Sequence, residues 1–364
     1  MEALFCSTLS FVQCIIYITN LFKKMKKFID LRSDTVTRPT SEMLKAMFIS
    51  EVGDDVFGED PTVNLLEQKA AEIFGMDSGL FCPSGTMANQ IAIKAHTQPM
   101  DEVICDRISH VYMYEGGGIM FNSGASVKLI LGDRGRIKAE DVLSNINPDD
   151  VHYPNTRLVC IENTCNRGGG SLYSMEEMEA ISKVCHSNTL SFHLDGARIF
   201  NAIVETGMKP AWLGNHFDSI SVCLSKGLGA PVGSVLLGSK EFIKKSRRIR
   251  KVFGGGMRQA GYLASAGLYA LDHHIDRLLD DHKRARIIGE KLRSLTYVEE
   301  VMPVDTNIII FTLKESMAVG NFLDYLKTHD ILAMKFGPQM IRFVTHLDFT
   351  DEEMSKLLNV LERA

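Results

Sequence analysis

Two residues that follow apolar runs could carry covalent and proton chemistry. Lys226 comes after the run 219–225, among serines and glycines. A lysine removed from water can form a Schiff base with a carbonyl group, although a single loop lysine more often reaches solvent. Asp195 ends the run 190–195, where it could pair with a cofactor's ring nitrogen or cap the following turn. Because ligands of open α/β folds bind where parallel strands end, the two together favour a functional site.

Two further segments could complete such a site. Ser84, Gly85 and Thr86 precede an expected helix, whose first amides could hold a phosphate, although Ser-Gly-Thr is also an ordinary helix cap. The segment has neither the lysine of a Walker loop nor the glycine pattern of a dinucleotide site, which disfavours a nucleotide. His110 could stack on a planar ring and exchange protons, although a single histidine is more often structural.

Strands and helices that alternate along the chain would have to position these residues. Helical stretches such as 87–96 and 175–184 lie between the runs. Apolar strands separated by helices predict an α/β architecture, with a parallel sheet covered on both faces. The apolar runs that predict strands are 80–82, 103–105, 158–162, 190–195, 219–225 and 234–238.

The last third of the sequence changes in character after the glycines at 254–256. One long helix is expected over 259–295, followed by strands at 307–313 and 340–347 and a closing helix. This pattern predicts a smaller C-terminal α+β domain whose boundary lies inside the long helix.

Composition excludes several classes of protein. The chain has 364 residues, of which 45% are hydrophobic and 23% charged, with a net charge of −5. These values are typical of globular domains and give no general attraction for nucleic acid or anionic membranes. The 8 cysteines are scattered, which favours free thiols in a reducing compartment, and no His or Cys spacing predicts a metal site.

The first residues differ from the rest. An apolar run at 4–22 precedes four lysines within 23–27. A secretory signal, a membrane anchor and an over-long gene start beginning before Met25 are the three interpretations, and the segment makes a poor secretory signal. We favour the start at Met25, so that residues 1–24 are a non-native or anchor-like extension.

Taken together, these segments resemble the low-specificity L-threonine aldolase family, whose members depend on pyridoxal phosphate and have the aspartate aminotransferase fold (fold type I). The resemblance runs from Ile29 to the end of the chain, and members of this family commonly begin just before the first matching string. The matching strings, besides Ser-Gly-Thr and His110, are IDLRSDTVTRP (29–39), VGDDVFG (52–58), DPTVN (60–64), DGARIFN (195–201), SKGLG (225–229), GGGMRQ (254–259) and RFVTHL (342–347).

The resemblance implies a role for each matching residue. Lys226 would hold pyridoxal phosphate, Asp195 would meet its pyridine nitrogen, and His110 would stack on its ring and act as the favoured base. The phosphate would bind at Gly85 and Thr86, beside Ser84. The substrate carboxylate would be held by Ser33, Arg198 and Arg342, and Lys251 and Arg258 would reach the phosphate region of a partner subunit.

One position departs from the family pattern. The family often has Glu-Asn-Thr-His-Asn where this sequence reads ENTCN at 162–166. Cys165 would therefore lie near the substrate's β-hydroxyl group, and a thiol is a weak hydrogen-bond partner there. The preference between threonine and allo-threonine is accordingly open, and other β-hydroxy amino acids could be preferred.

The resemblance implies a large domain with a mainly parallel seven-stranded sheet, over 25–275 together with an N-terminal arm, and a small domain over 276–364. It implies retro-aldol cleavage of L-threonine and L-allo-threonine to glycine and acetaldehyde, in a cytoplasmic homodimer or homotetramer with shared active sites. A pyridoxal-phosphate-dependent β-eliminating lyase or racemase is the alternative enzyme, and a non-catalytic cofactor-binding protein is the alternative from another class.

Overall fold

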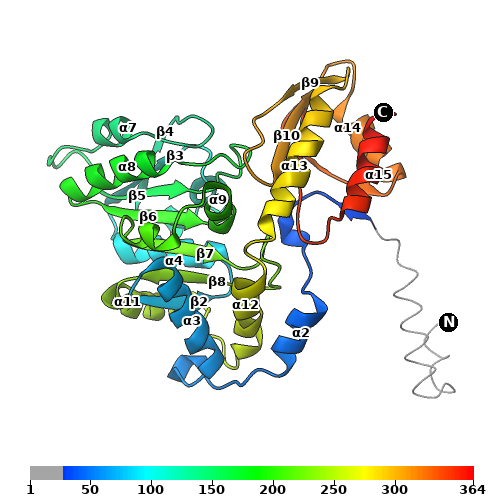
Figure 1. The fold of residues 1–364 in the computed structure, drawn as a ribbon. Coiled ribbons are helices and arrows are strands. Elements are labelled where there is room, and N and C mark those ends of the chain that lie inside the picture. Colours follow the sequence, from blue (N-terminus) through cyan, green and yellow to red (C-terminus); the bar gives the residue numbers. More distant parts are fainter. Residues whose placement is uncertain (1–27) are drawn as a thin grey trace, which may run out of the picture.

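The computed structural model describes residues 28–364, so the apolar run at 4–22 lies outside the described residues. Its larger unit is built on one sheet, seen in Figure 1 with helices on both sides. The strands of this sheet are β2 (Ser78–Cys82), β3 (Asp101–Asp106), β4 (Ser126–Ile130), β5 (Asn155–Glu162), β6 (Ser191–Gly196), β7 (Ser219–Cys223) and β8 (Ser234–Gly238).

The seven strands lie in the order β2-β8-β7-β6-β5-β3-β4. Neighbours from β4 to β7 pair in parallel, whereas β8 runs antiparallel to both β7 and β2. The prediction of a mainly parallel seven-stranded sheet is therefore confirmed. Because β3, β5, β6 and β7 are parallel, the residues that follow them gather at one edge.

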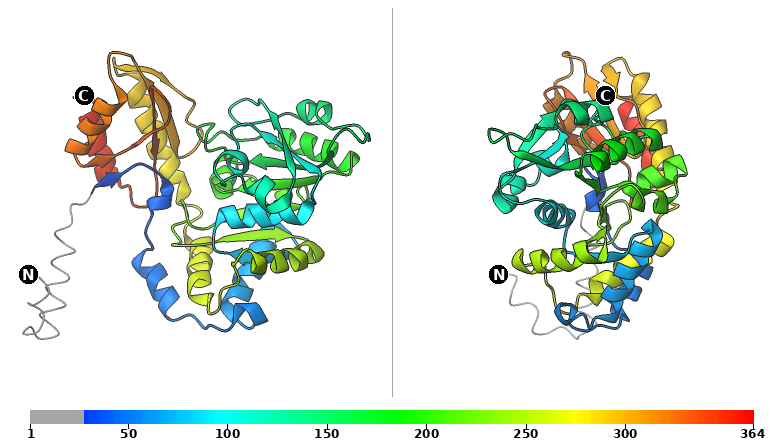
Figure 2. Two further views of the ribbon diagram at one scale, coloured as in Figure 1. Left: turned by 180° about the vertical axis from the view of Figure 1, so that it is seen from behind. Right: turned by 90° about the vertical axis from the view of Figure 1, so that its left-hand side faces the viewer.

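Helices cover both faces of this sheet (Figure 2). One face packs its largest apolar cluster against α3, α8, α9 and α12, and the other lies under α4, α6 and α11. The helices up to this point in the chain are α2 (Ser41–Phe48), α3 (Pro61–Phe74), α4 (Gly85–His96), α5 (His110–Met113), α6 (Gly118–Ser123), α7 (Ala139–Ser144), α8 (Met175–Ser187), α9 (Ile199–Thr206), α10 (Pro210–Gly214), α11 (Lys240–Val252) and α12 (Gly261–His273), with the 3-10 turns η1 (Asp34–Val36) and η2 (Asp55–Phe57).

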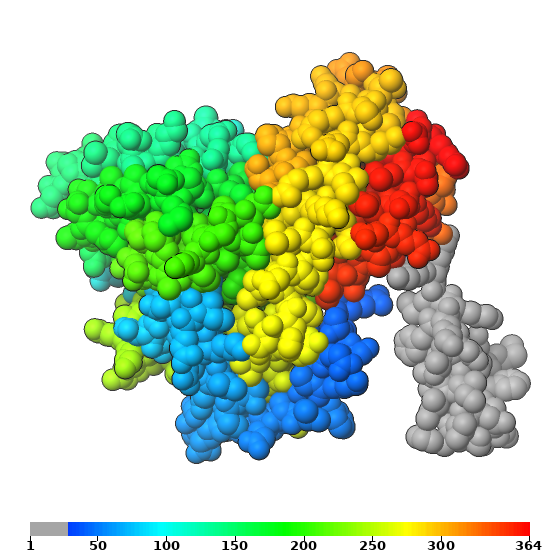
Figure 3. All heavy atoms as spheres, in the orientation of Figure 1, coloured from blue at the N-terminus to red at the C-terminus, as the bar shows by residue number. Residues whose placement is uncertain are grey.

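The C-terminal part forms a second, smaller unit around a four-stranded antiparallel sheet in the order β12-β13-β10-β9. Figure 3 shows its last helix packed beside the helix that leads into it, and the two helices make direct contacts. The elements of this unit are α13 (Leu278–Arg293), β9 (Val298–Val301), β10 (Ile308–Leu313), α14 (Val319–Thr328), β11 (Ile331–Leu332), β12 (Met334–Lys335), β13 (Met340–Val344) and α15 (Asp351–Leu361).

The N-terminal arm joins the two units. β1 (Ile29–Asp30) pairs in parallel with β11, and the buried side chains of Ile29 and Leu31 belong to the apolar cluster of the C-terminal unit. Leu278 packs in the core of the larger unit, whereas Ala285, on the same helix, packs in that of the smaller one. The apolar clusters thus divide within α13, and the domain boundary at 276 stays a prediction.

Two local expectations were wrong. The long helix expected over 259–295 is interrupted between His273 and Leu278, so that α12 and α13 are separate helices. The edge strand β4 was missed, because only Ile130 among its five residues is buried and the segment has no continuous apolar run. Within residues 28–364, no helix is long and apolar enough to cross a membrane, and the cytoplasmic location stays a prediction.

Candidate active site

The structure brings the predicted lysine, aspartate and histidine to the same sheet edge. Asp195 is the next-to-last residue of β6, Lys226 follows β7, and His110 begins α5 after β3. Asp195 is 2% exposed, whereas the side chain of His110 is 28% exposed and can meet a ligand. Residues far apart in the sequence therefore form one candidate site, as the strand order predicts.

A buried amide and a buried carboxylate hold this group together. Nδ2 of Asn89 donates to Oδ2 of Asp195 at 3.0 Å and to Oε1 of Glu115 at 2.9 Å. Glu115 also accepts from Nδ1 of His110 at 3.0 Å and from Nε2 of Gln90 at 2.6 Å. Oδ1 of Asp195 accepts only from the backbone N–H of Ala197 among the described residues, so it can accept another N–H.

The hydrogen bond to Glu115 sets the chemistry of the His110 ring. A carboxylate only accepts, so Nδ1 carries the hydrogen and Nε2 presents a lone pair. Burial opposes charge on this imidazole, but the Glu115 bond and the charges of Asp195, Glu115 and Glu162 outweigh burial and raise the pKa of His110. Nε2 has no partner within residues 28–364 and is suited to take a proton.

Glu162 links His110 to the C-terminal unit. Its carboxylate accepts from the backbone N–H of His110 and from that of Asn166, each at 2.9 Å. The side chain of Asn166 accepts in turn from Nη1 of Arg342 at 2.8 Å. Burial, with the charge of Asp195, raises the pKa of Glu162. The position of Arg342 is thus tied to that of His110.

Arg342 is a buried cation with spare hydrogen-bonding capacity. Arg342 is 6% exposed, and its Nε has no hydrogen-bond partner among the described residues. Its other bonds go to neutral acceptors, which are oxygens of Asn166 and Arg32 and the sulfur of Met334. Burial and the nearby charge of Arg198 lower the pKa of Arg342 to about 10. A buried guanidinium without a carboxylate partner is suited to bind the carboxylate of a ligand.

Arg198 is held differently from the sequence prediction. Its Nε and Nη2 donate to the two oxygens of Asp34 at 2.7 and 2.6 Å, and Asp34 is fully buried. Burial alone would raise the pKa of Asp34, but Arg198 holds it well below the usual range. While this ion pair is formed, Arg198 cannot use Nε and Nη2 to bind a substrate carboxylate. A contact between the carboxylate and Nη1 stays a prediction.

The start of α4 has the features of an anion site. Ser84 is its N-cap and accepts from the backbone N–H of Met87 at 3.1 Å. The hydroxyl of Ser234 is buried and has no hydrogen-bond partner among the described residues, and a Cβ on Gly85 would lie 3.5 Å from it. Together with Thr86 in the first turn, these groups could hold a phosphate through backbone amides and hydroxyls.

The loop that carries Lys226 is fastened from three sides. The carbonyl oxygen of Lys226 accepts from Oγ1 of Thr37 at 2.9 Å. The carbonyl oxygens of Gly227 and Leu228 accept from Arg277 and His274, in the segment that separates α12 from α13. Its ammonium group has no partner within residues 28–364. The backbone of the loop is therefore fixed at three carbonyl groups, while the amine of Lys226 remains free to react.

Four other predicted residues make no hydrogen bond or ion pair with Lys226, Asp195 or His110 within residues 28–364. Ser33 caps η1 and accepts from the backbone N–H of Thr35. Cys165 is fully buried, a Cβ on Gly135 would lie 2.1 Å from its sulfur, and burial raises the pKa of its thiol. This packing weighs against a direct substrate contact, which stays a prediction. Lys251 and Arg258 lie at the exposed surface, and Arg258 pairs with Asp54.

The sequence did not reveal Asn89, Glu115, Asp34 or Asn166 as parts of the site. Each acts on a predicted residue through a contact that the fold creates, and only Glu115 is near its partner in sequence, five residues after His110. The ligand atoms of His110, Glu115 and Asp195 lie within 4.8 Å of one another, a cluster that the spacing of residues in the sequence does not predict. The bond between His110 and Glu115, and the amide of Asn89 that joins Glu115 to Asp195, account for this proximity.

Known proteins resemble this one over most of its length. A family model described as beta-eliminating lyase matches residues 30–316. The low specificity L-threonine aldolase of Escherichia coli K12 is 41% identical over 330 residues, covering 90% of this chain and 97% of that protein. A probable low-specificity L-threonine aldolase of Arabidopsis thaliana is 40% identical over 342 residues, covering 92% of this chain and 96% of that protein.

A solved structure shows the same fold. The threonine aldolase of Leishmania major aligns with a TM-score of 0.80 at 22% sequence identity, covering 92% of this chain and 99% of that one.

Proposed function

Because the chain belongs to the beta-eliminating lyase family, we propose that it cleaves L-threonine and L-allo-threonine to glycine and acetaldehyde, and related β-hydroxy-α-amino acids to the matching aldehydes. Relatives about 40% identical over nine-tenths of the chain are named low-specificity L-threonine aldolases. The observation that carries the proposal is the buried Arg342, which makes no ion pair within residues 28–364 and is linked through Asn166 and Glu162 to His110. The residue that would bind a carboxylate is thereby linked by hydrogen bonds to the residue that would act as a base.

We further propose pyridoxal phosphate as the cofactor. The residues fit it: Lys226 has a free amine, Oδ1 of Asp195 has spare acceptor capacity, and the unpartnered hydroxyl of Ser234 adds to the start of α4. Lys226 would hold the cofactor, Asp195 would face its ring nitrogen, and Gly85 and Thr86 would hold the phosphate. When bound, pyridoxal phosphate supplies an electron sink for the pair left when the Cα–Cβ bond breaks.

The residues of the chain divide the remaining work. Arg342 would bind the substrate carboxylate and so orient the bonds at Cα, which decides which of them can break. Nε2 of His110 takes the proton from the β-hydroxyl group, and Glu115 stabilises the imidazolium that results. The proton that His110 takes from the β-hydroxyl group offsets the one that Cα takes up, so release of the aldehyde leaves glycine with no net change in protons.

We propose that the enzyme is a homodimer or homotetramer with shared sites. Lys251 and Arg258 are exposed, and the apolar side chains of Phe57 and Val252 beside them are 73% and 83% exposed. Exposed apolar groups of this size favour a protein interface. The molar mass in solution tests the proposal, because Phe57→Asp should lower it to that of a smaller assembly, and an unassembled wild-type protein would contradict it.

Product analysis tests the reaction itself. The enzyme loaded with pyridoxal phosphate should release acetaldehyde and glycine in equal amounts from both threonine diastereomers, with Lys226→Ala as the inactive control. Release of ammonia and a 2-oxo acid would instead identify a β-eliminating lyase. A changed configuration at Cα without cleavage would identify a racemase.

A further inference from the structure

A polar strip crosses the face of the large sheet that lies under α4. His193 and Asp195 alternate along β6 on this face, and Ser219 and Ser221 stand opposite them on β7 as register partners. All four are at most 2% exposed. Apolar clusters flank the strip on both sides, over β3 and β5 and over β2 and β8. Buried polar groups in such surroundings are costly unless they bond to one another.

Asn89 and His96 of α4 complete the strip. They lie two helical turns apart on one face of the helix. Nε2 of His96 lies 2.8 Å from Oγ of Ser219, and the same oxygen lies 2.8 Å from Nδ1 of His193. Nε2 of His193 is 3.1 Å from Oδ1 of Asn89, whose amide donates to Asp195 at 3.0 Å. We name this sequence of contacts the His96–Asp195 chain.

Chemistry fixes the direction of every bond in the chain. Asn89 faces two carboxylates with its amide nitrogen, so its oxygen must be the acceptor for His193. Burial lowers the pKa of His193 to about 4 and keeps the ring neutral, so only one of its two ring nitrogens carries a hydrogen. That nitrogen is Nε2, because Nε2 faces the acceptor oxygen of Asn89. Nδ1 of His193 must then accept from Ser219, which in turn accepts from Nε2 of His96. All donors point toward Asp195.

The His96–Asp195 chain orients side chains and does not conduct protons. A proton leaving Nε2 of His193 would arrive on the oxygen of Asn89, and an amide has no lone pair on nitrogen through which to pass it on. Asn89 also accepts from Oγ of Ser221 at 2.6 Å, so both its N–H groups and its oxygen are used. Such a saturated amide is held in a single orientation.

We propose that His193 is a positioning residue of the active site, which acts through Asn89 to hold the carboxylate of Asp195 where the cofactor's ring nitrogen needs it. This inference rests on the proposed function, because it takes the cofactor to be pyridoxal phosphate. The proposal does not require any side chain of the strip other than Asp195 to touch the cofactor or the substrate.

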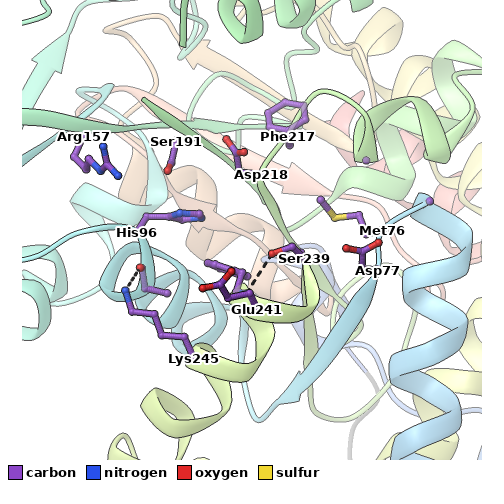
Figure 4. A pocket seen from close by; sticks show the side chains of 15 residues that line it. Met76, Asp77, His96, Arg157, Ser191, Phe217, Asp218, Ser239, Glu241 and Lys245 are labelled. Atoms are coloured by element: carbon purple, nitrogen blue, oxygen red, sulfur yellow. Dashed lines mark hydrogen bonds between the residues drawn. The ribbon is translucent and has the colours of Figure 1, made fainter. Parts of the chain in front are cut away.

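The His96 end of the His96–Asp195 chain lies at the opposite edge of the large sheet. His96 lines a cavity of about 640 Å³, with Arg157, Asp218 and Lys245 among its neighbours (Figure 4). Its ring stacks on Phe242 with the ring centres 4.5 Å apart, which fixes the ring plane at this end. The chain is therefore anchored at both ends.

Two amide substitutions at one position separate the contacts of His193. Glutamine places its amide near the position of Nε2, so His193→Gln can still donate to Asn89. Asparagine is shorter and reaches only the position of Nδ1, so His193→Asn keeps the Ser219 contact and loses Asn89. Both replace the same buried imidazole by a neutral amide, which makes each the control of the other.

Cofactor affinity is measured first, from visible absorbance on titration of the apoenzyme with pyridoxal phosphate. His193→Asn should weaken cofactor binding about 10-fold, since a hydrogen bond that supports a charged group is lost. His193→Gln should stay within about 3-fold of wild type. With saturating cofactor, His193→Asn should lower kcat by a similar factor and leave KM for threonine unchanged, because Arg342 is untouched.

Further variants keep the test decisive. Ser219→Ala removes a small buried hydroxyl and should weaken cofactor binding by a smaller factor, even if His193→Asn does not fold. His282→Asn serves as the control, because His282 is fully buried but bonds to Glu205 away from the site. Equal cofactor affinity in the two His193 variants, or an equal loss in His282→Asn, would overturn the proposal. Altered cofactor affinity in a protein that does not cleave threonine would refute the proposed function alone.

Discussion

Replacing Glu115 with glutamine tests how the His110 base is tuned. The substitution keeps the shape of the side chain but removes a fully buried negative charge 3.0 Å from Nδ1 of His110. Nε2 of Gln90, which donates to Glu115, would then face an amide and has to turn over. The principal electrostatic effect falls on His110, because Glu115 supplies both a hydrogen bond and a charge that raise its pKa.

The size of the effect follows from the type of bond. A hydrogen bond to a charged group contributes about 1.5–3 kcal/mol and a neutral one about 1 kcal/mol, so the imidazolium loses about 1 kcal/mol or somewhat more. This corresponds to a pKa of His110 lowered by about 1 unit. Since the neutral imidazole is the base, the acidic limb of kcat against pH should move about 1 unit toward lower pH.

Stability gives an independent measurement. The raised pKa of folded His110 contributes stability that is present in full below the unfolded value of about 6.5 and is lost as the pH rises through the folded pKa. Glu115→Gln should therefore lower the free energy of unfolding, measured with urea, by more at pH 5.5 than at pH 9.

Glu102→Gln is the control, because Glu102 is equally buried on β3 but bonds to Asn147. An acidic limb that stays in place in Glu115→Gln, or moves by the same amount in Glu102→Gln, would refute the assignment.

Three other substitutions give contrasting results. Arg342→Lys should raise KM for threonine about 10-fold, because a point charge cannot replace the two-bond guanidinium fork, while cofactor absorbance stays unchanged; an unchanged KM would argue against carboxylate binding there. Asp34→Asn should cost about 3–5 kcal/mol of unfolding free energy at pH 7, because Arg198 becomes an unpaired buried cation. This loss should shrink only below about pH 4, because Asp34 of the unfolded wild type then takes up a proton while Arg198 keeps the folded carboxylate charged. Cys165→His should change the ratio of rates on L-threonine and L-allo-threonine more than the rate on the better substrate, and an unchanged ratio would remove Cys165 from the β-hydroxyl site.

Local sequence patterns predicted the strands that end at the site. The runs that became β5, β6 and β7 are apolar because both faces of the sheet are covered, and this placed Asp195 and Lys226 at one edge. The polar strip under α4 could not be foreseen in the same way. His193 and Ser219 look like interruptions in apolar runs until the register shows that they stand opposite each other.

The break between α12 and α13 had no local signal either. The segment contains neither glycine nor proline, and its sequence suits a helix. The break coincides with tertiary contacts, in which His274 and Arg277 turn to donate to the carbonyl oxygens of the loop after β7. A contact of this kind depends on residues about 46 to 50 positions away and is invisible to a window of neighbouring residues.

The pairing of β1 with β11 has a consequence for synthesis on the ribosome. Ile29 pairs with Ile331, so β1 must wait until the segment that contains β11 has emerged before it finds its neighbour. The large sheet, complete at Gly238, can form before that moment. Loop-closure entropy also disfavours so distant a contact until other structure has brought its ends together. A nascent chain would therefore present the lysine, the aspartate and the histidine early, and gain Arg342 only after the C-terminal unit has been made.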